Sequence, residues 1–213
     1  MNWIDSHVHV WTADVQSYPL AEGIDRNEMR PSHFPPEVFL RHSRPSLVSR
    51  VVLIQSKNYN FDNSYVLDMV ERFPAMFRLV AILDHEEKEI DARMRSLLGQ
   101  GVTGFRIFQP ESQDDQWLRY PGYDLMFEAA SKTGQAICTS IKPEGIQEVG
   151  RMCEVHPNTN VVIEHMAHIG ELNQVSDKEV DSLCDLSSNP RVNIKISRLY
   201  SLGAQQPPHD DLA

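Results

Sequence analysis

The chain of 213 residues has 41% hydrophobic and 23% charged residues, a balance typical of a folded globular domain and unlike that of a disordered chain. Its formal net charge of -10 repels polyanions, so we expect no nucleic-acid partner. No apolar stretch is long enough to span a membrane, and the first residues do not resemble a signal peptide. The three cysteines form no paired motif, so we expect reduced thiols and a cytoplasmic location.

Short runs of β-branched residues alternate with amphipathic stretches along the chain. The predicted strands are residues 3–10, 50–55, 78–83, 102–108, 136–141, 161–165 and 192–196. Apolar residues at helical spacing predict helices between them, and a long polar segment follows the first strand. This alternation predicts parallel βαβ units with right-handed crossovers.

Two architectures fit this alternation, an open doubly wound sheet and a closed eight-stranded barrel. No Gly-x-Gly-x-x-Gly motif follows the first strand, which weakens a dinucleotide-binding interpretation. An eight-stranded barrel typically needs about 250 residues. This chain ends one strand and at least one helix short of that pattern.

His7 and His9 are the first candidates for chemistry. Residues two apart on a strand project from the same face, so the two imidazoles are expected to converge. They lie near the carboxyl end of the first strand, where barrel enzymes assemble their sites. Imidazole suits zinc, iron and nickel. An isolated His-x-His is more often a pair of solvent-facing histidines, but Asp5 lies two residues earlier and is positioned to orient one ring.

His165 ends the sixth predicted strand and is the next candidate. A histidine at that position needs a polar partner or a metal. Alone, it would more often be a hydrogen-bonded core residue; together with His7 and His9 it becomes a candidate third metal ligand. Three protein ligands leave a position open for water, as in catalytic zinc sites. Such a metal lowers the pKa of its bound water toward about 7 and polarises a carbonyl.

Four further polar residues are candidates for substrate binding. Arg106 lies between large apolar residues in the fourth predicted strand, where an unpaired charge is costly. A bidentate clamp on a substrate carboxylate and an internal ion pair with Glu164 explain it about equally well. Gln55 ends the second strand, and either packing or a place in the site explains it. His168 and Arg198 follow the sixth and seventh strands, where loop residues in water are the more common alternative to a place at the mouth.

Taken together, four segments resemble the amidohydrolase-2 branch of the amidohydrolase superfamily, with its 2-pyrone-4,6-dicarboxylate lactonases and related lactonases. They are residues 5–9, 104–106, 162–165 and 195–197. The resemblance covers essentially the whole chain. It implies an α/β fold, a (β/α)8 TIM barrel with seven strands readable and the eighth missing. Residues 1–213 would then be a single amidohydrolase-like barrel domain, incomplete at the C-terminus.

The resemblance also implies a function. The chain would be a hydrolase that opens a lactone or related carbonyl bond in a small carboxylated substrate. His7, His9 and His165 would occupy metal or oxyanion-binding positions, and Arg106 would contact a substrate carboxylate. The implied cofactor is a divalent metal, with zinc the leading candidate, although some lactonases of this branch work without an ion. The alternatives are a metal-dependent decarboxylase and an inactive, truncated barrel that acts as a binding protein.

One feature of the family pattern has no counterpart in the sequence. The family carries an aspartate in a Gly-Ser-Asp motif at the end of the last strand, and Asp210 and Asp211 do not match it. We therefore expect a fragment of a longer protein. The expected partner is a small-molecule substrate, with no membrane partner, and homo-oligomerisation through an exposed strand edge is an alternative.

Overall fold

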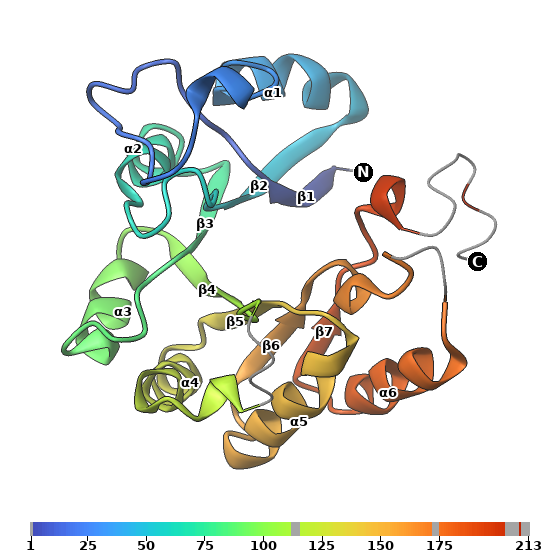
Figure 1. The fold of residues 1–213 in the computed structure, drawn as a ribbon. Helices are drawn as coiled ribbons and strands as arrows, with labels where there is room; N and C mark the ends of the chain where they lie inside the picture. The colour runs from blue at the N-terminus through green and yellow to red at the C-terminus, as the bar shows by residue number, and fades with distance from the viewer. Residues whose placement is uncertain (1, 112–115, 172–174, 203–208, 210–213) are drawn as a thin grey trace. The chain divides into compact units, whose positions relative to one another are not determined.

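A computed structural model describes residues 2–111, 116–171, 175–202 and 209 (Figure 1). The chain divides into two compact units, 1–106 and 107–213, with the boundary inside the fourth strand. The expectation of one barrel domain stays a prediction. Asp210 and Asp211 lie outside the described residues.

The first unit contains parallel strands in chain order, with a helix between successive strands from β2 onward and the long polar segment and α1 before β2 (Figure 1). The strands are β1 (Trp3–Val8), β2 (Val48–Ile54), β3 (Phe77–Ala81) and β4 (Val102–Phe108), which crosses the boundary. The helices are α1 (Pro36–Ser43), α2 (Ser64–Arg72) and α3 (Ile90–Leu98), with short 3-10 turns η1 (Arg26–Glu28) and η2 (Arg44–Ser46). The helical crossovers keep all these strand pairs parallel.

The second unit continues the same alternation. Directly after β4, the Gln109 N–H donates to the carbonyl of Ser140, the last residue of β5, at 3.1 Å. The strands β5 (Ala136–Ser140), β6 (Asn160–Ile163) and β7 (Val192–Ile194) pair in parallel. The helices are α4 (Pro121–Thr133), α5 (Ile146–Val155) and α6 (Asp177–Ser187). The 3-10 turns are η3 (Trp117–Arg119), η4 (Pro143–Gly145), η5 (Glu164–His168) and η6 (Leu199–Ser201).

The strands are apolar because helices and neighbouring side chains remove both of their faces from water. Fully buried strand residues include Leu53, Ile54, Phe77, Leu79, Ala81, Ile137, Val161 and Ile163. The helices contribute one apolar face each, with Val66, Met94, Met126, Phe127, Ala130 and Val149 buried. The apolar residues at strand and helix spacing in the sequence are therefore the ones that form the core.

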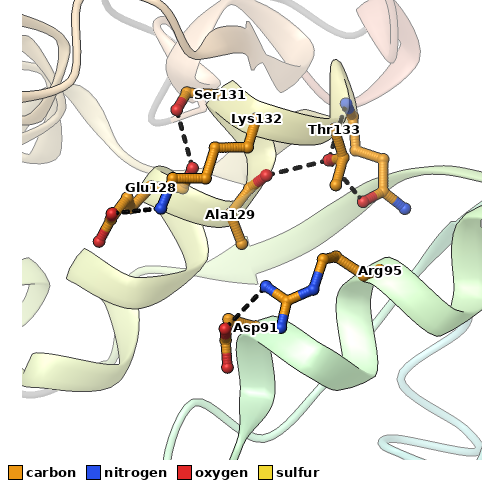
Figure 2. A network of polar contacts seen from close by, with 8 residues as sticks. Asp91, Arg95, Glu128, Ala129, Ser131, Lys132 and Thr133 are labelled. Atoms are coloured by element: carbon orange, nitrogen blue, oxygen red, sulfur yellow. Dashed lines mark hydrogen bonds and ion pairs between the residues drawn. The ribbon is translucent and has the colours of Figure 1, made fainter.

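The outer faces of the helices carry ion pairs one turn apart (Figure 2). In α3, Arg95 Nη1 lies 2.7 Å from Asp91 Oδ2, and in α4, Lys132 Nζ lies 2.5 Å from Glu128 Oε1. All four side chains are exposed, so each pair contributes only about 0.3–0.5 kcal/mol to stability.

Among the described residues, no helix has the length and apolarity needed to cross a membrane.

Six of the seven strands end one or two residues earlier than the sequence predicted, and three of these early ends affect candidate site residues. β1 ends at Val8, β6 at Ile163 and β7 at Ile194. His9, His165 and the segment after residue 194 therefore follow their strands rather than belonging to them. After β6 the reason is visible in the backbone, because residues 165–168 have φ between 52° and 56°, which ends the extended conformation. His9 and His165 thus lie just beyond the carboxyl ends of their strands, whereas His7 and Arg106 lie within strands.

Candidate functional site

His7 and His9 converge at the carboxyl end of β1. Their Nε2 atoms lie 3.3 Å apart, and the rings form an edge contact with centroids 5.0 Å apart and an interplanar angle of 83°. His7 belongs to the strand and His9 follows it, and both are partly exposed. The expected convergence of the two rings is therefore confirmed, although the second ring lies on the turn.

The spacing of these two nitrogens fits one metal ion. Zinc binds histidine nitrogen at about 2.0–2.1 Å in a tetrahedral arrangement, which places two ligand nitrogens about 3.3 Å apart. The two Nε2 atoms lie 3.3 Å apart, which equals the distance expected between two nitrogen ligands of one zinc ion. Without an ion, the same distance suits one N–H donating to the other ring. The two Nε2 atoms therefore have a spacing that suits a shared proton when no metal is bound and a shared cation when one is bound.

The tautomer of His9 is fixed by the neighbouring strand. Its Nδ1 lies 2.8 Å from the carbonyl oxygen of Ile54, the last residue of β2. A carbonyl only accepts, so Nδ1 carries the proton and Nε2 presents its lone pair toward His7. This arrangement is typical of metal-binding histidines. Asp5 accepts a hydrogen bond from the backbone N–H of His7 at 3.1 Å, and its predicted contact with an imidazole stays a prediction.

In the second unit, His165 begins an unusual turn after β6. It and the next three residues have left-handed backbone conformations, which cost L-amino acids about 1–2 kcal/mol each. His165 is 7% exposed, and its Nδ1 lies 2.8 Å from the hydroxyl of Ser197. The Met166 N–H donates to the carbonyl of Lys195, directly after β7, at 3.1 Å. The turn and the segment after β7 therefore fix the orientation of the His165 ring.

His168 and Arg198 also come together in the second unit. Arg198 Nη1 and Glu171 Oε1 each lie 3.4 Å from His168 Nδ1. Burial lowers the pKa of His168, and the charge of Arg198 lowers it further, whereas Glu171 raises it. Its Nε2 is buried and has no hydrogen-bond partner among the described residues. A neutral imidazole with an unmatched nitrogen beside a guanidinium is suited to receive a polar ligand.

Lys195 and Ser197 contact residues that directly follow β6 but were not among the predicted site residues. Lys195 Nζ lies 3.5 Å from Oε1 of Glu164, whose side chain is fully buried. A buried carboxylate needs such a cation nearby. The signal available in the sequence was the segment Lys195–Ser197, where two polar residues lie on either side of Ile196 after the seventh predicted strand begins.

Arg106 and Gln55 belong to the first unit and are both buried. Arg106 lies in β4 with 7% of its surface exposed, as expected for a charge held by partners. Gln55 is fully buried directly after β2, and its side-chain amide forms hydrogen bonds with backbone groups of the loop that it begins. Their predicted contacts with a substrate stay predictions.

Comparison with known proteins identifies the kind of chain. The model of the family described as "Amidohydrolase" matches residues 4–213. The chain is similar to the L-fucono-1,5-lactonase of Burkholderia ambifaria, with 24% identity over 213 residues, 98% of this chain and 71% of the relative.

Solved structures with low sequence identity share the fold. A probable 2-pyrone-4,6-dicarboxylic acid hydrolase from Acinetobacter baumannii, with citric acid bound, matches with a TM-score of 0.80 and 20% identity, covering 98% of this chain and 74% of that chain. An amidohydrolase from Burkholderia multivorans with bound zinc matches with a TM-score of 0.78 and 16% identity, covering 96% of this chain and 72% of that chain. The fold class is therefore the amidohydrolase type of TIM barrel, as predicted, with seven parallel strands described in this chain.

Proposed function

Since this chain belongs to the amidohydrolase family, we propose that it is a hydrolase that opens a lactone or related carbonyl bond in a small carboxylated molecule. The observation that carries the proposal is the His7 and His9 pair, with Nε2 atoms 3.3 Å apart and the His9 tautomer held by the Ile54 carbonyl. A lactonase among the relatives and a dicarboxylic acid hydrolase among the structural neighbours support the substrate class.

The proposed metal ligands are His7, His9 and, from the sequence pattern, His165. A bound divalent ion, with zinc as the candidate, would polarise the lactone carbonyl and lower the pKa of a bound water. The zinc-bound neighbour supports this choice of ion. The protein's part is to hold each ring in place, by the Ile54 carbonyl for His9 and by the Ser197 hydroxyl for His165.

Arg106, Arg198 and His168 are proposed to recognise the carboxylate groups of the substrate. A guanidinium binds a carboxylate through two parallel N–H donors, and such charged hydrogen bonds are about twice as strong as neutral ones. His168 offers an unmatched Nε2 beside Arg198. A carboxylated substrate therefore suits these groups better than a neutral one.

The test is a panel of lactones assayed with the full chain, prepared with zinc and after chelation. We expect acid release from lactones that bear a carboxylate, loss of activity on chelation and recovery when zinc is restored. Measurement of CO2 in the same reactions separates ring opening from decarboxylation. Release of CO2 without net acid would contradict the hydrolase proposal, as would absence of turnover with every lactone in the zinc-loaded protein.

A further inference from the structure

The loop between β2 and α2, residues 55–63, begins directly after the carbonyl that fixes His9. At its start, the Gln55 amide meets three backbone groups of the loop. Nε2 donates to the carbonyls of Asp62 at 2.5 Å and Asn60 at 3.3 Å, and Oε1 accepts from the N–H of Ser56 at 3.1 Å. Gln55 is fully buried, so water does not compete for these bonds. One side chain therefore fixes where the chain turns after Ile54.

The same loop also holds the chain on the other side of His9. The hydroxyl oxygen of Tyr59 accepts a hydrogen bond from the N–H of Thr12 at 3.0 Å, three residues beyond His9. The Asn58 carbonyl accepts from the N–H of Ala21 at 2.8 Å, farther along the segment that follows β1. The loop therefore begins directly after β2 and also forms hydrogen bonds with the polar segment that follows β1 at two places.

The Tyr59 side chain is itself firmly placed. It is 3% exposed and packs against the ring of Tyr65 in α2, with centroids 5.9 Å apart. Burial raises the pKa of Tyr59, so its hydroxyl stays neutral at ordinary pH. Tyr18 also contacts the ring of Tyr65, with centroids 5.0 Å apart, and its hydroxyl donates to Asp68 at 2.6 Å. Tyr18 thus shares the aromatic cluster without bonding to the chain next to His9.

We propose that Gln55 and Tyr59 are positioning residues for the His7 and His9 pair. Gln55 fixes the peptide that presents the Ile54 carbonyl to His9 Nδ1, and Tyr59 fixes the backbone that leaves the same histidine. Together they hold the ring with its Nε2 lone pair directed at His7. This inference rests on the metal site proposed above and assigns Gln55 a role different from the substrate contact expected from the sequence.

The test compares the full-length variants Gln55→Met and Tyr59→Phe with the parent protein. Nitrogen-15 NMR of the metal-free proteins at about pH 8, where an ordinary imidazole is neutral, reports the His9 tautomer directly. We expect a single tautomer protonated at Nδ1 in the parent and a mixture in Gln55→Met. Calorimetry with zinc alone should show an affinity lower by about 10-fold or more in Gln55→Met, the range for loss of an outer-shell partner. Tyr59→Phe should change both readouts in the same direction, by less.

The matched control is Tyr18→Phe, which removes a hydroxyl from the same aromatic cluster and should leave both readouts unchanged. Parent-like tautomer and zinc affinity in folded Gln55→Met and Tyr59→Phe would overturn the proposal, and a raised KM with unchanged zinc affinity would restore Gln55 to substrate binding. If Gln55→Met does not fold, an unchanged His9 signal in Tyr59→Phe overturns the proposal by itself. Failure of the parent to bind zinc would remove the proposed metal site, while the metal-free spectra would still decide the positioning role.

Discussion

The Nε2 atoms of His7 and His9 lie 3.3 Å apart although only His7 belongs to β1. The backbone of β1 positions His7. The hydrogen bond from His9 Nδ1 to the Ile54 carbonyl, 2.8 Å long, orients the His9 ring toward His7. Groups of β1 and β2 therefore both position these two imidazoles, whose nitrogens have the spacing of tetrahedral zinc ligands.

His9→Ala is expected to lower zinc affinity and lactone turnover by more than about 100-fold, because it removes a direct ligand rather than an outer-shell partner. Zinc calorimetry and turnover measurements check this. Urea unfolding should change little, since the ring is partly exposed. His42→Ala, at an exposed histidine of α1, is the control and should match the parent in all three measurements. Equal zinc affinity in the His9 and His42 variants would eliminate His9 as a ligand.

Arg106→Met is expected to raise KM for carboxylated lactones about 10- to 100-fold, the effect of losing hydrogen bonds to a charged group worth about 1.5–3 kcal/mol. Lactones without a carboxylate should be affected much less, so the ratio of the two KM changes is the measurement that matters. Arg95→Met removes an exposed guanidinium paired within α3 and serves as the control. Equal KM changes for charged and neutral lactones would assign Arg106 to the core instead.

The sequence predicted the existence and order of the strands well because each strand is a short, largely apolar segment between polar stretches, and this signal is local. It also predicted the convergence of His7 and His9. It did not predict the left-handed turn at residues 165–168, since no glycine marks that turn and only tertiary contacts can stabilise it. The contact between His165 and Ser197 was missed for the same reason, because it joins residues 32 positions apart.

The left-handed turn leads to a prediction on stability. Ala167 is fully buried with φ 52°, a conformation that glycine adopts without strain. Ala167→Gly is therefore expected to raise the free energy of unfolding by up to about 1 kcal/mol. The same substitution at Ala130, fully buried in α4, should lower it by about 1 kcal/mol because helical glycine is unfavourable. Urea unfolding of both variants checks that the two changes in the free energy of unfolding have opposite signs. Destabilisation of equal size at the two positions would show that the backbone of Ala167 is not strained.

Asn63 gives a second prediction on stability. Its Nδ2 donates to the carbonyls of Ile82 at 2.7 Å and Phe61 at 2.9 Å, and its Oδ1 accepts from the N–H of Ile82 at 3.1 Å. Asn63→Ala leaves buried backbone groups unpaired, so the free energy of unfolding should fall by about 2–4 kcal/mol. Asn27→Ala, at an exposed position, should change it by less than about 0.5 kcal/mol. Similar denaturation midpoints for the two variants would show that these bonds do not stabilise the fold.

Cys153 predicts a dependence of stability on pH. Burial, with a smaller contribution from the charge of Glu154, raises the pKa of this thiol from an ordinary value of 9.0 to about 11. Between these two values the unfolded chain has lost the thiol proton while the folded chain keeps it, so the free energy of unfolding falls as pH rises. Urea unfolding at steps from about pH 8 to 11 should therefore show a steeper fall in the free energy of unfolding for the parent than for Cys153→Ala.

Thiol labelling at the lower end of this pH range should modify the exposed Cys184 first and leave Cys153 protonated and unreactive. Parallel pH profiles for parent and variant, or labelling of Cys153 as fast as Cys184, would show that the thiol is not shielded as the packing of α5 requires.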